Sequence, residues 1–475
     1  MFYTKVFEMC GYSAEEIDKE RSRIERAIQI LELGPDDFAL AEERLPKQVD
    51  VTLEGVRKCL KLWWQELINL VLGKEEGKKF IYFTPPTVPT EPMEGIVASL
   101  IRNNRDDVIV ASPDLLLCTV LGCLFDRNNP LVAVGEELGL AAGAAHCGLS
   151  QTWVAGMKKD IIPVPVLAVS SAYMCDQVPE AQELIAELFH HETVYIDRVY
   201  DTGWDEWPAV SQKQLEYMKG EFRRALDRCG EVIGIEITDE DIVEGRRRYL
   251  QAAIPYFDLR NFMTMDPPPF SAADMMPFFY MFLNVLRHKE PFMDACRTLA
   301  KELKERVKSG YGVVPKGSPS VFFPLVPNPD TTIVHIVESL GMAIPCFILM
   351  YPAKAEIEHK QRTATDPLGK IIESYMSKPW YTHNFYPLKQ WIREMAENFK
   401  VDGILYFQTS VCRCNSAENP LALRKVLVEE TNLPTILLEG DYHCTRVYGA
   451  EETRTRIETF AEVVRAHQAA RLAAA

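Results

Sequence analysis

The sequence contains no pair of cysteines in CxxC spacing, although 12 cysteines occur among its 475 residues. This absence excludes the usual zinc-ribbon and thioredoxin motifs, so any metal ligands must come from separated parts of the chain. A disulfide framework is excluded as well, because such frameworks belong to short, cysteine-dense secreted chains. Most of the thiols are therefore expected to be small buried side chains, and a few to bind metal.

A basic excess, a targeting segment and a long apolar run are also missing. The formal net charge of −16 argues against nucleic acid or an anionic membrane as the main partner. Charged residues occur throughout the first twenty positions, which leaves no apolar region for a signal peptide. The most apolar tract, 108–125, is interrupted by Ser112, Pro113 and Asp114 and therefore predicts protein core. We expect a cytoplasmic protein with neither a nucleic-acid nor a membrane partner.

The order of the apolar segments predicts an α/β protein. Residues 1–75 show helical periodicity, and Ser13 and Glu16 have the spacing of a capping box. Short apolar runs separated by helices follow, which is the pattern of parallel strands joined by crossovers. We predict two Rossmann- or flavodoxin-like domains with parallel sheets, plus N-terminal and intervening helices. The predicted units are an N-terminal helical segment 1–75, a first α/β domain 76–210, a helical segment 211–312 and a second α/β domain 313–475.

Three shorter segments carry their own predictions. The run MMPFFYMFLNVL (275–286) indicates a buried helix or a subunit contact. The basic stretch GRRRYL (245–250) is typical of a solvated helix face. A strand is expected in IPCFILMYP (344–352), and a last helix over 450–470, after which AARLAAA is expected to fray.

Several predicted strands end in carboxylate or thiol residues. Glu91 follows the first strand, Cys175 follows VPVLAVSSAYM, Cys412 follows ILYFQTSV, and Cys444 lies in GDYHC after TILLE. In doubly wound sheets, ligands bind outside the carboxyl ends of the strands. One cysteine from each half of the chain therefore falls where a cleft between two domains is expected. Thiolates are the soft ligands that suit iron–sulfur centres.

The segment VDGILYFQTSVCRCNSAENP, followed by LPTILLEGDY and TRTRIETF, resembles the 2-hydroxyacyl-CoA dehydratase and benzoyl-CoA reductase family. SSAYMCDQVPEAQEL resembles the second cysteine segment of that family, and DPLGKIIESYM the helix between strands of its second domain. The likeness covers 77–190 weakly and 318–465 well. It implies a [4Fe–4S] cluster held by three cysteines from both domains, with one iron open to substrate.

Carried onto this sequence, the resemblance implies the cluster ligands Cys147, Cys175 and Cys412. The first of these lies in GAAHCGLSQTWVAGM, where the local match is loose, so Cys118 and Cys123 are rivals for its role. Cys414 and Cys444 are additional thiols near the motif. The other cysteines lie on helical or strand patterns and are expected to be core, namely Cys10, Cys59, Cys229, Cys296 and Cys346.

The resemblance also indicates a group that transfers protons. Glu91, in TVPTEPMEGI, is similar to the Pro-x-Glu loop of the family and would act as the catalytic carboxylate beside the cluster. The alternative is that Glu91 caps a helix starting at Met93, a place that acids favour. His146, Tyr442 and His443 are further candidates for moving protons.

The implied function is that of an iron–sulfur subunit of a radical (R)-2-hydroxyacyl-CoA dehydratase or an ATP-dependent benzoyl-CoA reductase. Such a subunit passes low-potential electrons to an acyl-CoA substrate, with the GRRRYL stretch as an alternative contact for CoA phosphates. It would need a related second subunit and a separate ATP-hydrolysing activator, because the chain has no GxxxxGK[ST] loop. A homodimeric double-cubane-cluster reductase and a non-catalytic partner subunit of the same fold are the alternatives.

Overall fold

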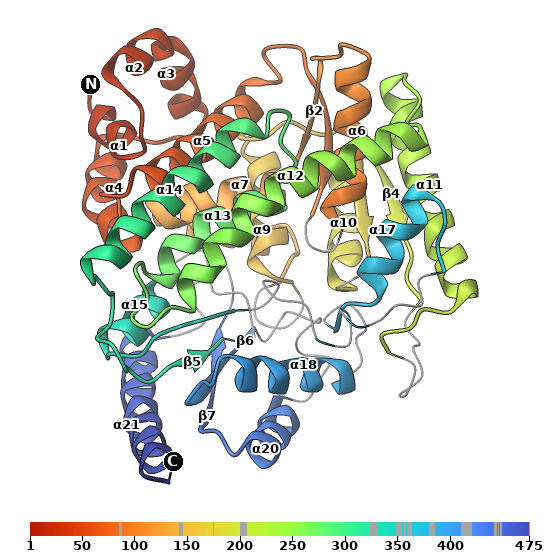
Figure 1. The fold of residues 1–475 in the computed structure, drawn as a ribbon. Helices are drawn as coiled ribbons and strands as arrows, with labels where there is room; N and C mark the ends of the chain where they lie inside the picture. The colour runs from red at the N-terminus through yellow and green to blue at the C-terminus, as the bar shows by residue number, and fades with distance from the viewer. Residues whose placement is uncertain are drawn as a thin grey trace.

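Two parallel β-sheets with covering helices organise the chain (Figure 1). The computed structural model describes residues 1–84, 88–141, 146–173, 175–199, 207–323, 331–347, 354, 358, 363–379, 385–409, 420–440, 444, 446 and 449–474. The predicted α/β class with parallel sheets is confirmed. The proposed domain boundaries stay a prediction.

The segment before the first sheet is helical, as its periodicity predicts. Ser13 and Glu16 form the predicted capping box, with Glu16 N–H donating to Ser13 Oγ at 3.2 Å and Ser13 N–H to Glu16 Oε2 at 2.8 Å. Two backbone N–H groups that the helix leaves unpaired are thereby satisfied. The helices are α1 Thr4–Met9, α2 Ala14–Lys19, α3 Arg21–Ile30, α4 Pro35–Gln48 and α5 Glu54–Leu72.

The first sheet has the strand order β2-β1-β3-β4, and all its pairs are parallel. Its strands are β1 Lys79–Phe83, β2 Val108–Ala111, β3 Leu167–Ser171 and β4 Glu192–Ile196. Strand β3 is buried along its whole length, as expected for a strand whose two faces are covered by crossover helices. The connecting helices are α6 Thr90–Arg102, α7 Pro113–Leu117, the π-helix η1 Cys118–Leu124, α8 Asn128–Glu137, α9 Gly148–Lys158 and α10 Gln177–Phe189.

The intervening helices pack onto the first half of the molecule. Helix α12 lies against α6, and α14 lies against α5 (Figure 1). Helix α17 (Pro367–Met376) of the C-terminal half also reaches back, packing against α11 (Gln212–Ile233) and α6. The intervening elements are α11 Gln212–Ile233, α12 Asp239–Met263, η2 Ala272–Met275, α13 Met276–Leu283 and α14 Glu290–Ser309.

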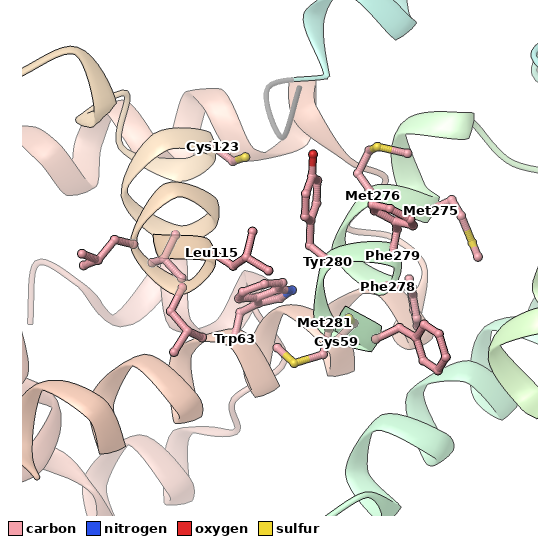
Figure 2. Close-up of a cluster of buried hydrophobic side chains, with 14 of the residues drawn as sticks. Cys59, Trp63, Leu115, Cys123, Met275, Met276, Phe278, Phe279, Tyr280 and Met281 are labelled. Atoms are coloured by element: carbon pink, nitrogen blue, oxygen red, sulfur yellow. The ribbon is translucent and has the colours of Figure 1, made fainter. Parts of the chain in front are cut away.

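The predicted buried helix in MMPFFYMFLNVL is α13. Figure 2 shows its aromatic and methionine side chains grouped with Trp63 of α5, Leu115 of α7 and Cys123 of η1. The labelled side chains in this cluster are all buried. Trp63 also donates its Nε1–H to the carbonyl of Pro277 at 3.0 Å, which pairs the indole nitrogen inside the core.

The second sheet has the strand order β5-β6-β7, again all parallel. The strand expected over 344–352 is described only as far as residue 347, and there it forms parallel bridges between Ala343 and Ser320 and between Phe347 and Phe323. The elements of this half are β5 Val321–Phe322, α15 Thr332–Ser339, α17 Pro367–Met376, α18 Phe385–Asn398, β6 Gly403–Thr409, α20 Pro420–Thr431, β7 Thr435–Gly440 and α21 Ala450–Ala474.

The expectation that the C-terminal AARLAAA frays is wrong. Helix α21 continues to Ala474, and Arg471 Nη2 donates to Asp402 Oδ1 at 2.7 Å. Asp402 lies just before β6 and is 2% exposed, and its other oxygen accepts from Ser320 N–H at 3.1 Å, so the buried carboxylate is satisfied from both sides. The ion pair fixes the last turn of the helix. Within the part of the chain that the structure describes, no helix has the length and apolarity needed to cross a bilayer.

Candidate active site at the strand ends of the first sheet

Buried polar side chains gather at the carboxyl ends of the first sheet. Thr84 follows β1, Ser112 follows β2, Ser171 ends β3 and Arg198 follows β4, and all four are buried. Burying such groups costs free energy unless they find partners, so their concentration at one edge marks a place built for polar contacts. The strand order reverses between β1 and β3, which is where doubly wound sheets open a binding crevice.

Glu91 lies in α6, the element that follows β1, and only 6% of it is exposed. Helix α6 begins at Thr90 with Pro89 as its N-cap, so Glu91 belongs to the first turn. The alternative placed the helix start at Met93, which is three residues too late, but Glu91 does lie in the first turn, where an acid is favoured. The catalytic role of Glu91 stays a prediction.

Two cations oppose the effect of burial on Glu91. Burial is the largest effect and raises the pKa of the Glu91 carboxyl above its ordinary value, although Arg246 of α12 and Lys378, which follows α17, oppose this rise in part. The carboxylate thus sits where α6 meets elements from two distant parts of the sequence.

Cys147 and its two predicted rivals lie in one neighbourhood. Cys147 is the N-cap of α9 and is 8% exposed, and Cys118 begins the π-helix η1 and is fully buried. Burial raises the pKa of the Cys118 thiol, a hydrogen bond with Thr152 lowers it, and Cys147 and Cys123 raise it electrostatically. The tertiary structure therefore brings together three thiols that the sequence presents as alternatives.

Cys175 lies in the connection between β3 and α10 and is 5% exposed. Arg198, beyond β4, donates from Nη1 to the carbonyl of Tyr173 at 2.6 Å and so braces this connection.

Cys412 and Cys414 lie outside the described residues. Among those that are described, no group of three or more histidine, cysteine or acidic residues is arranged to hold a metal ion. The ligand set Cys147, Cys175 and Cys412 stays a prediction.

Cys444 is tied to the first half of the chain through one arginine. The thiol is buried and hydrogen-bonded with Arg446, whose Nη2 also contacts Glu136 Oε1 of α8 at 2.9 Å. The segment after β7 therefore reaches the helices that follow β2.

His146, next to Cys147, is half-buried. Tyr442 and His443 fall outside the described residues.

Asp114 and Glu94 are buried carboxylates that were not predicted as site residues. Asp114 accepts a hydrogen bond from Leu115 N–H at 2.9 Å, and burial raises its pKa to about 7. Glu94 is fully buried and forms an ion pair with Lys289. A signal existed for each of them: Asp114 is an acid inside an apolar tract, directly after a strand. Glu94 lies one helical turn after Glu91.

The prediction for GRRRYL is only partly right. Arg247 is exposed and pairs with Glu244, as on a solvated face. Arg248 is half-buried instead, and its Nη2 donates to the carbonyls of Leu286 and Arg287, both at 2.9 Å. The physical reason is that this part of α12 lies against α6 and not in solvent. By contrast, the thiols expected in the core are all fully buried, namely Cys10, Cys59, Cys229, Cys296 and Cys346.

Comparison with known proteins gives a consistent family. The family model described as 2-hydroxyglutaryl-CoA dehydratase, D-component, matches residues 121–464. The alpha subunit of (R)-2-hydroxyglutaryl-CoA dehydratase from Acidaminococcus fermentans is 21% identical over 64% of this chain and 62% of its own length. The beta subunit of (R)-phenyllactyl-CoA dehydratase from Clostridium sporogenes is 23% identical over 52% of this chain and 64% of its own. The alpha subunit of (R)-2-hydroxyisocaproyl-CoA dehydratase from Clostridioides difficile is 21% identical over 84% and 93%.

Proposed function

Because the chain belongs to the 2-hydroxyglutaryl-CoA dehydratase D-component family, we propose that it is a subunit of an (R)-2-hydroxyacyl-CoA dehydratase. The family match over residues 121–464 carries this proposal, since it spans β3 and β4 of the first sheet and all of the second. The relatives described above are all dehydratase subunits, which favours water loss over reduction of an aromatic ring. In such a reaction a 2-hydroxyacyl-CoA thioester loses the hydroxyl group of carbon 2 and a proton of carbon 3 as water.

The proposed cofactor is a [4Fe–4S] cluster with Cys147, Cys175 and Cys412 as ligands. Cys147 and Cys175 are buried thiols at the carboxyl edge of the first sheet, and buried thiols are the donors that iron–sulfur clusters take. When bound, the cluster would supply an iron with an open position and a source of single electrons for the thioester. The buried surroundings would keep water away from the reacting carbonyl.

Glu91 is the proposed proton carrier. A carboxyl must be ionised before it can accept a proton and protonated before it can donate one. The groups around Glu91 that raise or lower its pKa therefore decide which of these it can do. Burial is the largest influence and raises the pKa of Glu91, although Arg246 and Lys378 oppose it, so the side chain is suited to holding a proton near neutral pH and passing it on. Glu91 lies in the first turn of the helix that follows β1, on the side of the sheet where ligands bind in doubly wound folds, so it is a candidate to act on a bound thioester.

A related second subunit and a separate ATP-dependent activator are the proposed partners. The chain is similar to relatives named as alpha subunits and to one named as a beta subunit. This double likeness supports an enzyme built from two homologous chains. The activator is proposed because the sequence has no GxxxxGK[ST] loop with which to hydrolyse ATP in the P-loop manner.

Anaerobic purification followed by iron, sulfide and turnover measurements tests the proposal. The chain is co-expressed with its candidate partner and activator, and the complex is assayed with a panel of (R)-2-hydroxyacyl-CoA esters and benzoyl-CoA. About four irons per chain with dehydration of a 2-hydroxyacyl ester is the expected result. About eight irons would favour the double-cubane alternative. An iron-free chain in an active complex would indicate a non-catalytic partner subunit and contradict the proposal.

Cysteine variants test the ligand set separately. Cys175→Ser, Cys147→Ser and Cys412→Ser should each lose most of the iron and the visible absorption of the cluster, because serine oxygen is a harder ligand than thiolate. Cys296→Ser is the matched control, since this buried thiol lies in α14 within the core and should leave the iron content unchanged. An intact cluster spectrum in the Cys175 variant would show that the assignment is wrong.

A further inference from the structure

Helix α12 carries apolar side chains on two opposite faces. Its inner face packs against α6, α14 and α17, and a Cβ atom added at Gly245 would lie only 2.5 Å from the nitrogen of Gly95 in α6. The buried apolar residues of this face are Ile242, Ala252, Tyr256, Leu259 and Met263. A surface helix of a soluble domain is typically apolar on one face only, so a second apolar face indicates a second contact.

The outer face of α12 exposes three large apolar side chains in one row. Val243, Leu250 and Ile254 are 52%, 45% and 65% exposed, and Ile254 is the most exposed large apolar side chain in the described part of the chain. Their spacing of seven and four residues places them on one side of a helix. Arg247 and Asp258, both exposed, complete this outer row. Single exposed apolar residues are ordinary, whereas a row along one helix indicates an interaction surface.

The two charges of the outer row have opposite signs and enclose its apolar centre. Arg247 comes one turn before Leu250, and Asp258 comes one turn after Ile254. Arg247 donates from Nε and Nη2 to Glu244, each at 2.6 Å, and its other N–H groups are left for a further acceptor. Asp258 forms no ion pair within the residues that the structure describes. At about 100° per residue, both charges lie on the same flank of the row.

We propose that two copies of this chain pair through the outer row, with their α12 helices antiparallel about a two-fold axis midway between Leu250 and Ile254. This axis sets Leu250 of one copy against Ile254 of the other copy. It also brings Arg247 to the level of Asp258 of the other copy, on the same flank. Because the symmetry repeats each contact, the interface gains two apolar pairs and two pairs of opposite charge. A parallel arrangement would instead set like charges against each other.

This pairing goes beyond the proposed function, because it joins two copies of one chain and not the chain and its related subunit. The related subunit would then bind a different face, and two such pairs would meet at α12, which crosses the near side of the molecule in Figure 1. The pairing uses neither the proposed cluster nor turnover. It can therefore fail or hold independently of the dehydratase proposal.

Sedimentation velocity of the full chain over a range of concentrations measures this association directly. Wild type should form a dimer, and Ile254→Lys should raise the dissociation constant by about a hundredfold or more, because the symmetric interface would bury the new charge twice. Leu188→Lys is the matched control, since Leu188 is 40% exposed on α10 and lies off the outer row. Its dissociation constant should follow wild type. Thermal unfolding followed by circular dichroism checks that both variants fold.

A charge exchange tests the antiparallel arrangement. Arg247→Asp and Asp258→Arg should each weaken the dimer by about tenfold, because each variant sets like charges against each other in two places. The double variant should return to near the wild-type dissociation constant, since it restores the opposite signs. A double variant as weak as the single ones would show that these two side chains do not meet.

Two results would overturn the pairing as a whole. One is a wild-type chain that stays monomeric at about 100 μM, or a dimer that Ile254→Lys leaves unchanged. The other is an outer row that binds the related subunit instead. In that case Ile254→Lys would abolish the complex with the co-expressed subunit, while the chain alone would never dimerise.

Discussion

Replacing Gly245 with alanine should weaken the crossing of α6 and α12 on which the Glu91 site depends. In an open helix position, a change from glycine to alanine stabilises by about 1 kcal/mol. At Gly245 the added methyl group would instead meet backbone atoms of Glu94 and Gly95 at 2.5–2.6 Å. Overpacking costs about 1–3 kcal/mol, and the upper end applies because backbone atoms cannot rotate away. The expected net loss in free energy of unfolding is about 2 kcal/mol.

Gly220→Ala is the matched control for this prediction. Gly220 also lies inside a helix, α11, but its added Cβ would have no heavy atom within 4 Å. The control should therefore gain about 1 kcal/mol. The two variants differ by one methyl group on the same kind of residue, so their opposite signs isolate the effect of the crossing.

Urea-induced unfolding, followed by circular dichroism and tryptophan fluorescence, gives the free energy for both variants. We expect Gly245→Ala to unfold at a lower urea concentration than wild type, and Gly220→Ala at a higher one. Should Gly245→Ala prove as stable as Gly220→Ala, the two helices would not be in backbone contact.

Three further changes test the buried charges. Lys289→Met should lower the free energy of unfolding in urea by about 3–5 kcal/mol, because it leaves Glu94 buried without its closest cation. Adding Glu94→Gln to this variant should recover a large part of the lost stability. Equal losses in the single and the double variant would contradict the pairing. Burial raises the pKa of Asp114 to about 7, so the folded wild type holds a proton there that the unfolded chain releases above about pH 4. Wild type should therefore lose stability as pH rises from about 4 to 7. In Asp114→Asn the loss over that range should be smaller by on the order of 4 kcal/mol. Arg471→Met should speed amide exchange in the last turn of α21, and unchanged exchange would show that Asp402 does not hold it.

Local patterns in the sequence account for most of the elements. The capping box at Ser13, the buried apolar strands and the all-apolar helix α13 each depend on residues a few positions apart. The sites that follow strands were predictable for the same reason. Glu91 comes after β1 and Cys175 after β3 in any parallel sheet with this order of segments.

Pairings between distant segments account for what the sequence analysis missed. The basic run of α12 contains three consecutive arginines that look alike in sequence, yet Arg247 is solvated and Arg248 binds the connection after α13. Whether a given arginine faces solvent or a neighbouring element depends on the rotation of α12 about its axis where Gly245 meets α6. A helical periodicity cannot fix that rotation when polar residues occur on several faces.

The sequence by itself determined the α/β class, the buried strands and the placement of one acid and one thiol after two neighbouring strands. These features follow from interactions within a turn of helix or along a single strand. Only the tertiary structure decided which charges meet: Arg471 with Asp402, and Lys289 with Glu94. Such partners are far apart along the chain, and they become specific only when packing removes water from around them.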